Sequence, residues 1–171
     1  MLCGRVNSVL CSSIGTGKFV TLFYGVLDAE RRRFEYTNAG HLLPILIRAG
    51  GDARPLQHGG AVLGVLPEWK YENSNVPLNP GDRLLLFTDG ITEAALPGGE
   101  EFGDRRLVEA AQKYVNRSIG EMKSLLLTEV KQFCDSELQD DATLIVISAL
   151  PARKQSEAKS QECDTVTAGQ S

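Results

Sequence analysis

The sequence has few of the residues on which several common classes of protein depend. Histidine occurs twice and tryptophan once in 171 residues, and the four cysteines are Cys3, Cys11, Cys134 and Cys163. No two cysteines have the C-x-x-C spacing, so the sequence indicates neither a zinc site nor a disulfide framework. Such cysteines are typical of a reducing compartment, and we therefore predict a cytoplasmic location.

The sequence also lacks a strongly basic segment and a long apolar one. Its formal net charge is −4, and the longest basic run is the three arginines at positions 31–33. This charge pattern offers no basic face for nucleic acid. No apolar run approaches the ~20 residues that span a bilayer, and the N-terminus has no signal-peptide pattern. We expect neither a nucleic-acid partner nor a membrane segment.

The hydrophobic content of the sequence and its distribution along the chain are typical of one globular domain followed by a tail. The chain is 42% hydrophobic, and a domain of this size buries roughly two thirds of the surface that its unfolded chain exposes. Residues 151–171 lose the hydrophobic periodicity and most of the apolar content. We therefore predict a domain over residues 1–150 and a disordered tail over residues 151–171.

The first hundred residues are predicted to form mainly β-structure. After a short helix at the start of the chain, segments rich in β-branched and aromatic residues predict strands. These strands cover residues 19–28, 34–40, 42–47 and 83–88. The stretch 48–55 is interpreted as a turn, and the glycine-rich stretch after it as a loop.

The second half of the domain is predicted to be mainly helical. The hydrophobic period changes to 3.6 residues near position 104, which predicts helices over residues 104–114 and 118–133. Ser118 and Glu121 have the spacing of a capping box at the start of the second helix. A last strand is predicted over residues 143–149. Strands followed by helices are typical of an α+β domain built on a largely antiparallel sheet.

Two aspartates stand at the ends of predicted strands. Asp89 follows the strand 83–88, and Asp140 precedes the strand 143–149. If these strands are antiparallel neighbours, the two carboxylates meet at one sheet edge, where oxygen ligands suit Mg²⁺ or Mn²⁺. Gly90 would allow a positive φ and a close backbone approach there. Alternatively, both aspartates only cap a turn and a strand entry, where aspartate is common. The pattern by itself leaves both interpretations open.

Six motifs resemble a known family by their order along the chain. They are "FVTLFYGVLD", "YTNAGHLLPILI", "LGVLP", "LNPGDRLLLFTDGITEA", "EFGDRRL" and "DDATLIVI". The same order is found in bacterial PPM-type serine/threonine phosphatases of the stage II sporulation protein E-like branch. The resemblance covers nearly all of residues 19–147. It implies a β-sandwich flanked by helices, with a metal centre at one end that hydrolyses phosphoserine or phosphothreonine in a partner protein.

The resemblance also implies roles for the two aspartates. Asp89 of "TDG" and Asp140 of "DDAT" are similar to two later metal ligands of the family. Two divalent ions, Mn²⁺ or Mg²⁺, would hold a bridging water that attacks the phosphorus atom in line, so that no protein nucleophile is required. In agreement, the chain has no convincing Ser/His/Asp or Cys/His set.

The sequence departs from the family at its beginning. The family's domain opens with strands that carry a Gly-Asp element, whose aspartate bridges both metals, and this chain does not contain that element. The sequence therefore looks like the C-terminal two thirds of the domain, with the N-terminal strands missing. We expect weak metal binding and little or no activity from this chain by itself. The uncovered sheet edge would also invite pairing with another chain, including self-association.

Four further residues near these motifs have less specific interpretations. His41 lies where distant relatives of the family carry a metal-binding aspartate, but a histidine that supports the site without binding metal is favoured. Asp141 is expected to orient the site rather than to bind the metal. Glu93 is expected to face solvent after the metal loop, and Asp82 of "NPGD" to be a turn residue.

Two functions of different class are compatible with the sequence. The first is a metal-dependent serine/threonine phosphatase in bacterial signalling, acting on an anti-sigma-factor antagonist as this branch commonly does. The second is a non-catalytic phosphatase-like module that binds a partner without turnover. The presence of Asp89 and Asp140 favours the first function, whereas the missing Gly-Asp element favours the second.

Overall fold

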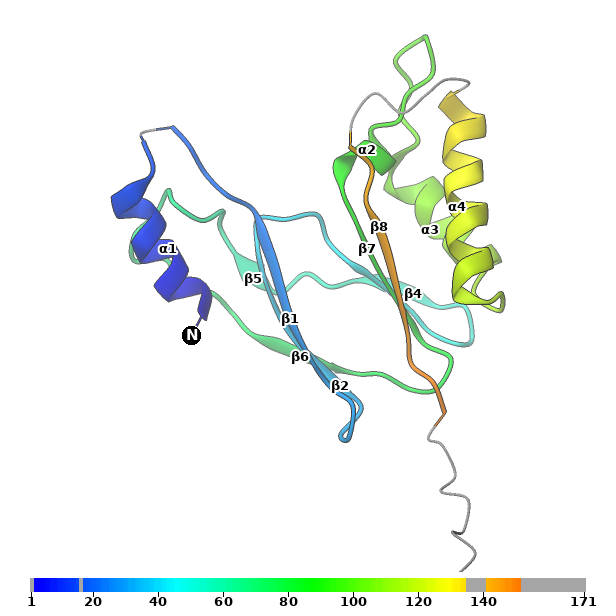
Figure 1. Ribbon diagram of the computed structural model, residues 1–171, viewed down its shortest axis with the longest axis horizontal. Helices are drawn as coiled ribbons and strands as arrows, with labels where there is room; N and C mark the ends of the chain where they lie inside the picture. Colours follow the sequence, from blue (N-terminus) through cyan, green and yellow to red (C-terminus); the bar gives the residue numbers. More distant parts are fainter. Residues whose placement is uncertain (1, 16, 135–140, 152–171) are drawn as a thin grey trace, which may run out of the picture.

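Helix, sheet, sheet and helices form four successive layers in the computed structural model of the chain (Figure 1). The structure describes residues 2–15, 17–134 and 141–151. Helix α1 (Leu2–Ser13) forms the first layer, and helices α3 (Gly103–Lys113) and α4 (Ile119–Cys134) form the last. The two sheets lie between these helical layers.

Both sheets are built from short strands. Sheet 1 contains β1 (Leu22–Asp28), β2 (Arg33–Ala39), β5 (Gly59–Gly60) and β6 (Ser74–Pro77), and β2 pairs with each of the others. Sheet 2 has the order β4 (Ala53–Pro55), β3 (Ile45–Ile47), β7 (Arg83–Phe87) and β8 (Leu144–Ser148). All pairs in sheet 2 are antiparallel. A short helix, α2 (Asp89–Thr92), begins where β7 ends.

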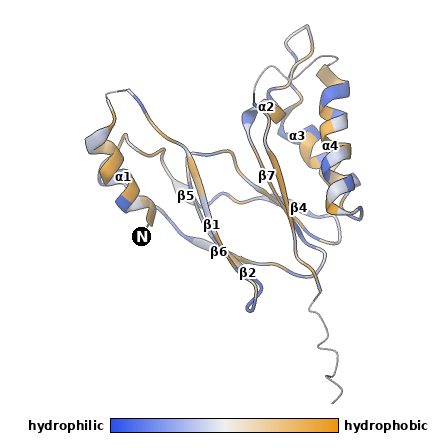
Figure 2. Cartoon of the chain, in the orientation of Figure 1, coloured by the Kyte–Doolittle hydropathy of each residue, from blue (hydrophilic) through white to orange (hydrophobic). Residues whose placement is uncertain are grey.

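Three apolar cores hold the layers together. The core between the sheets joins residues of both, among them Phe34 and Tyr36 of sheet 1 with Leu46 and Leu84 of sheet 2. A larger core fills the space between sheet 2 and the helices that follow it. The third lies between α1 and sheet 1 and includes Cys3. Figure 2 shows β7 as a largely apolar ribbon, as expected for a strand buried on both faces.

The structure confirms the predicted α+β class and the sandwich flanked by helices. The strands before position 88 lie where the sequence predicts the main ones, and α3 and α4 begin and end within one residue of their predicted ranges. The last strand, β8, pairs antiparallel with β7, as expected. The capping box is also present, because Glu121 accepts hydrogen bonds from the backbone N–H and the hydroxyl of Ser118.

Three strands occur in segments that the sequence predicts to be turn or loop. The predicted turn 48–55 contains β4, and the predicted loop after it contains β5 and β6. These strands are two to four residues long and carry glycine or proline. They exist because their backbones pair with β3 and β2, and a local sequence pattern does not record such long-range pairing. Within the described ranges, no helix has the length and apolar character needed to cross a membrane.

Candidate metal site at the end of sheet 2

Strand β7 delivers Asp89 to one end of sheet 2. The strand ends at Phe87, Thr88 follows in an extended conformation, and Asp89 is the first residue of α2. The side chain of Asp89 is exposed, and its Oδ1 accepts a hydrogen bond of 3.0 Å from the backbone N–H of Gly90. No other hydrogen bond or ion pair to this carboxylate is found in the described part of the chain. Its second oxygen thus faces solvent at the end of a buried strand.

Thr88 ties this end of β7 to the segment that leads into β8. Its backbone N–H donates to the carbonyl oxygen of Thr143 at 3.1 Å, and its hydroxyl donates to the carbonyl oxygen of Asp141 at 2.9 Å. The same hydroxyl accepts from the N–H of Thr143 at 2.9 Å. The three bonds hold residues 141–143 beside the start of α2. Thr88 was not among the site residues predicted from the sequence, although its place in "TDG" directly before Asp89 was a usable signal.

The backbone of Gly90 lies close to the segment that leads into β8, as predicted. Gly90 does not, however, have the predicted positive φ. A Cβ atom at this position would lie 2.8 Å from the carbonyl oxygen of Asp141. The expected positive φ is wrong, because Gly90 lies inside α2 and is absent from the described residues with φ above zero. The close contact, rather than a left-handed backbone, therefore requires glycine at this position.

The structure tests the predicted meeting of the two aspartates only in part. The antiparallel pairing of β7 and β8 is as predicted, and it brings the backbone of Asp141 against Gly90. Asp140 lies outside the described residues, so its approach to Asp89 stays a prediction. Asp141 has an exposed side chain. Glu93 is exposed as well, and its N–H donates to the carbonyl oxygen of Asp89 at 2.7 Å.

His41 lies at the same end of sheet 2, in the segment that leads into β3. Its backbone is clamped by Asn38, whose Oδ1 accepts from the His41 N–H at 2.7 Å and whose Nδ2 donates to the His41 carbonyl at 2.9 Å. The half-buried ring places Nδ1 3.3 Å from the hydroxyl of Thr21, a residue that was not predicted from the sequence. Among the described residues, no hydrogen bond joins His41 to Asp89.

A cavity of about 370 Å³ opens at this end, between the His41 segment, sheet 2 and α3. Phe87, two residues before Asp89, forms part of its wall, and Val108 of α3 forms another part. Its polar lining residues are His41, Arg54 and Asp104. The candidate site therefore combines an exposed carboxylate with a neighbouring hollow whose wall is mainly apolar.

The donor chemistry fits Mn²⁺ or Mg²⁺, although the number of donors is small. These ions prefer hard oxygen ligands, and Asp89 offers a carboxylate oxygen without a competing cation. Within the residues that the structure describes, however, no group of three or more His, Cys, Asp or Glu side chains could hold a metal ion. Asp89 would therefore need further oxygen ligands to hold such an ion.

The fold is similar to that of PP2C-type phosphatase domains. The SiaA-PP2C domain of Pseudomonas aeruginosa has a TM-score of 0.74 at 20% identity, with 86% of this chain and 59% of that chain covered. The phosphatase domain of SpoIIE from Bacillus subtilis has a TM-score of 0.65 at 22% identity, with 85% and 64% covered. At these identities the likeness shows the fold alone.

The family model described as Stage II sporulation protein E (SpoIIE) matches residues 1–150, and the chain belongs to this family. Phosphoserine phosphatase RsbU of Bacillus subtilis is 30% identical over 146 residues, and protein IcfG of Synechocystis is 31% identical over 130 residues. These alignments cover 84% and 75% of this chain. The chain spans only 43% of RsbU and 20% of IcfG.

Proposed function

We propose that this chain supplies part of the catalytic site of a metal-dependent protein serine/threonine phosphatase. The observation that carries this proposal is the exposed carboxylate of Asp89 at the end of β7, in a chain that belongs to the SpoIIE family. RsbU, a relative with 30% identity, is named a phosphoserine phosphatase. The substrate would be a phosphoserine or phosphothreonine protein in bacterial signalling, and more specifically an anti-sigma-factor antagonist.

Asp89 and Asp140 would hold a Mn²⁺ or Mg²⁺ ion in this proposal. When bound, a divalent ion would lower the pKa of a water molecule, so that hydroxide forms near neutral pH. It would also stabilise negative charge on the phosphoryl oxygens. The chain's own contribution is positional. The Gly90 N–H orients the Asp89 carboxylate, and Thr88 holds the segment 141–143 in place beside it. Asp141 and His41 would support the site without binding the metal.

The first experiment measures Mn²⁺ binding to the chain by isothermal titration calorimetry. Binding should be weak, because Mg²⁺ and Mn²⁺ need more oxygen ligands than two carboxylates provide. Asp89→Asn should weaken it at least tenfold, since it removes a ligand charge and nearly preserves the side-chain shape. Glu93→Gln is the matched control, because it removes one exposed carboxylate from the same short segment. Equal affinity of the two variants would overturn the assignment of Asp89.

The second experiment joins the chain to the upstream Gly-Asp segment that the family resemblance implies. This protein should release phosphate from a phosphoserine protein in the presence of Mn²⁺, and a chelator should stop the reaction. Asp89→Asn or Asp140→Asn should abolish the activity, whereas Glu93→Gln should retain it. Full activity in either aspartate variant would show that these carboxylates are not metal ligands.

A non-catalytic module that binds a partner is the second candidate function. The observation that favours it is the absence of a group of three potential ligands among the described side chains. In that case the chain joined to the Gly-Asp segment would stay inactive with Mn²⁺ although it binds the phosphoprotein. Phosphate release by the joined protein would exclude this candidate.

A further inference from the structure

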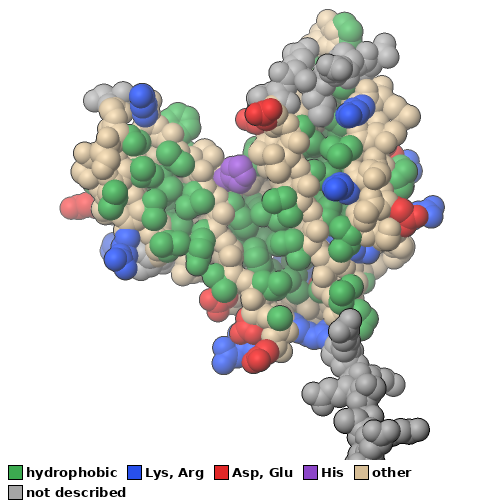
Figure 3. Space-filling model, viewed as in Figure 1, with side chains coloured by type: hydrophobic (Ala, Val, Ile, Leu, Met, Phe, Trp, Pro, Cys, Tyr) green, Lys and Arg blue, Asp and Glu red, His purple; other side chains and the backbone are tan. Residues whose placement is uncertain are grey.

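A second cavity, of about 490 Å³, is lined by residues of both sheets on the side of the sandwich away from β1 and β8. In sheet 1 it is bordered by β2 and β6, and in sheet 2 by β4 and the segment that follows β4. None of its lining residues belongs to β1, β7, α2 or β8. Figure 3 views the face that carries β1 and β8, where apolar side chains are spread widely. The second cavity is therefore separate from the candidate metal site.

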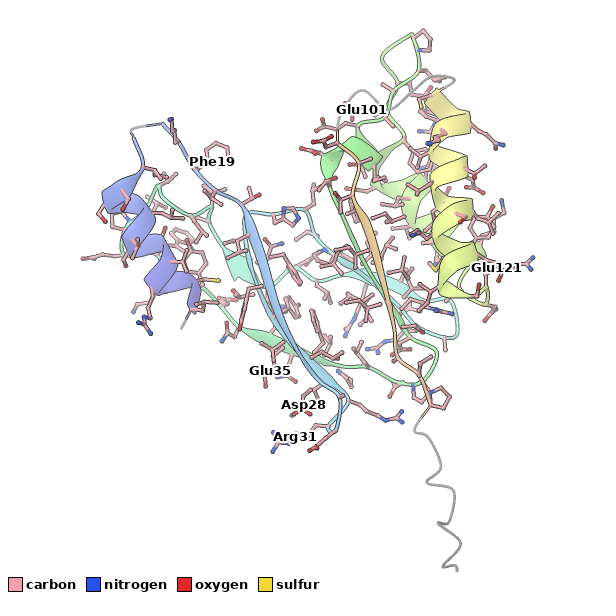
Figure 4. All side chains as sticks on the ribbon, in the orientation of Figure 1. Phe19, Asp28, Arg31, Glu35, Glu101 and Glu121 are labelled. Carbon is pink, nitrogen blue, oxygen red and sulfur yellow. The ribbon has the colours of Figure 1, made fainter. Side chains whose placement is uncertain are left out.

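The lining of this cavity carries positive charge and no carboxylate. Arg54 of β4 and His58 line it, whereas no aspartate or glutamate does, although the chain as a whole has a formal net charge of −4. Glu35 directly precedes Tyr36 on β2, so its side chain points to the opposite face of the strand. Figure 4 shows Glu35 near Asp28 and Arg31, at the turn end of sheet 1. The cavity thus favours an anionic ligand over a cationic one.

The Arg54 guanidinium is available to such a ligand. It is exposed, and within the described ranges neither an ion pair nor a side-chain hydrogen bond is found for it. Arg54 also borders the cavity beside His41, but it does not pair there with Asp104. A guanidinium offers five N–H donors in a planar arrangement that matches the oxygens of a phosphate group.

Three further polar side chains line the same cavity. Tyr36 is 3% exposed, and its hydroxyl lies 3.3 Å from Nδ1 of His58. Ser74 is paired with Tyr36 across β2 and β6, which places the two side chains on one face of sheet 1. If the Tyr36 hydroxyl donates to Nδ1, the proton of the neutral His58 ring is on Nε2, which is then a donor. Ser74 adds a hydroxyl donor on a neighbouring strand.

The backbone around His58 is held firmly by β2. The His58 carbonyl accepts from the N–H of Asn38 at 3.1 Å, and the Gly59 carbonyl accepts from the N–H of Glu72 at 3.1 Å. A Cβ atom at position 59 would lie 1.9 Å from the carbonyl oxygen of Asn38, so only glycine permits this approach. Donors that are fixed on paired strands lose little conformational freedom when a ligand binds.

We propose that this cavity binds a phosphate group. Arg54, Ser74 and the Nε2–H of His58 would donate to its oxygens, while Tyr36 fixes the orientation of the His58 ring. Donors from three separate segments suit the three terminal oxygens of a phosphate ester better than the two oxygens of a carboxylate. The cavity has the size of a small-molecule site, and its wall includes the apolar residues Pro55 and Val76, which could contact the organic part of an ester. This proposal does not depend on the phosphatase function.

NMR titration of the ¹⁵N-labelled full chain tests the proposal, with a chelator and no added metal so that the Asp89 site does not contribute. O-phosphoserine and inorganic phosphate are the probes, and they should shift the backbone amides of His58, Gly59 and Ser74 in a saturable manner. Tighter binding of O-phosphoserine would assign the site to phosphate esters, and equal binding would assign it to inorganic phosphate. Free serine, which lacks only the phosphate group, should cause no such shift.

Arg54→Gln should weaken binding of the phosphate probes at least tenfold, because it removes the positive charge of the cavity. Arg33→Gln is the matched control, since Arg33 is an exposed arginine of β2 that does not line the cavity. It should leave the affinity unchanged. Circular dichroism checks the fold of both variants. Ser74→Ala, a smaller change that should weaken binding at least threefold, replaces Arg54→Gln if the latter does not fold.

Three results would overturn the proposal. Neither phosphate probe could cause a saturable shift, or free serine could bind as tightly as O-phosphoserine does. Arg33→Gln could also weaken binding as much as Arg54→Gln, which would show a general effect of charge rather than a site at this cavity.

Discussion

Arg48 and Asp82 form an ion pair in which the carboxylate is almost completely buried. Arg48 Nη1 donates to Asp82 Oδ2 at 2.6 Å, and the Asp82 side chain is 2% exposed. Asp82 also accepts from the backbone N–H groups of Ala49 at 3.1 Å and Asn79 at 2.8 Å. Asp82 does lie in the "NPGD" turn, as predicted from the sequence. Its carboxylate additionally joins that turn to the segment after β3.

Asp82→Asn should lower the free energy of unfolding by about 1–3 kcal/mol. The change removes the charge that pairs with Arg48 and weakens the bonds from two backbone groups. Urea denaturation followed by circular dichroism measures the effect. Asp28→Asn is the control, because Asp28 pairs with Arg31 at the surface, where such pairs contribute about 0–1 kcal/mol. Equal losses in the two variants would show that the buried pair is not stabilising.

Gly90→Ala should destabilise the chain by roughly 1–3 kcal/mol, although alanine has a higher helix propensity than glycine. The cause is the 2.8 Å approach of the new Cβ atom to the carbonyl oxygen of Asp141, a backbone atom that moves only with its segment. Gly98→Ala is the comparison, since a Cβ atom there meets no atom within 4 Å. The expected order of urea midpoints is Gly98→Ala above Gly90→Ala, and the reverse order would contradict the close contact.

Ser118→Ala should raise the pKa of Glu121 toward its ordinary value of 4.5. Hydrogen bonds from the Ser118 side chain and backbone hold the pKa of the Glu121 carboxyl below that value. A lowered pKa in the folded state means that this contribution to stability is present above about pH 4.5. It disappears as the pH falls through the folded-state pKa. Carbon NMR titration measures the shift, and Ser124→Ala should leave the Glu121 titration unchanged.

The pKa of Glu129 should rise when either of its two donors is removed. Burial by itself raises this pKa, but hydrogen bonds from Lys113 and Tyr114 outweigh it, so the net shift is downward. The Lys113 bond measures 2.7 Å and links α3 to α4. We expect the increase to be larger for Lys113→Gln than for Tyr114→Phe, because the first change also removes a positive charge. The same NMR titration distinguishes the two, and an unchanged pKa in both variants would contradict these contacts.

Removal of residues 151–171 should leave the melting temperature nearly unchanged, because their sequence has little apolar content to bury. The domain boundary at residue 150 stays a prediction until this is measured. Differential scanning calorimetry of the two chain lengths gives the comparison. A loss of several degrees would show that these residues pack on the domain.

The sequence predicted those parts of the fold that have a clear period or a local signal. The strand that ends before Asp89 is a nearly continuous apolar run, and the stripe that includes Leu107 and Ala111 repeats every three to four residues. Both patterns follow from which side of an element faces a core. The candidate site was predicted less completely. Asp89 ends a recognisable strand, whereas Thr88 and Thr21 act through partners that are distant in the sequence.

By itself, the sequence determined the order of the main helices and strands, the antiparallel return of the last strand and the membership in the SpoIIE family. Tertiary structure alone decided that Gly90 is helical, that Asp82 is buried, and that β5 and β6 both pair with β2. The physical reason is the range of the interactions. Periodicity and turn chemistry act between neighbours, whereas burial, backbone pairing and close approach depend on residues that only folding brings together.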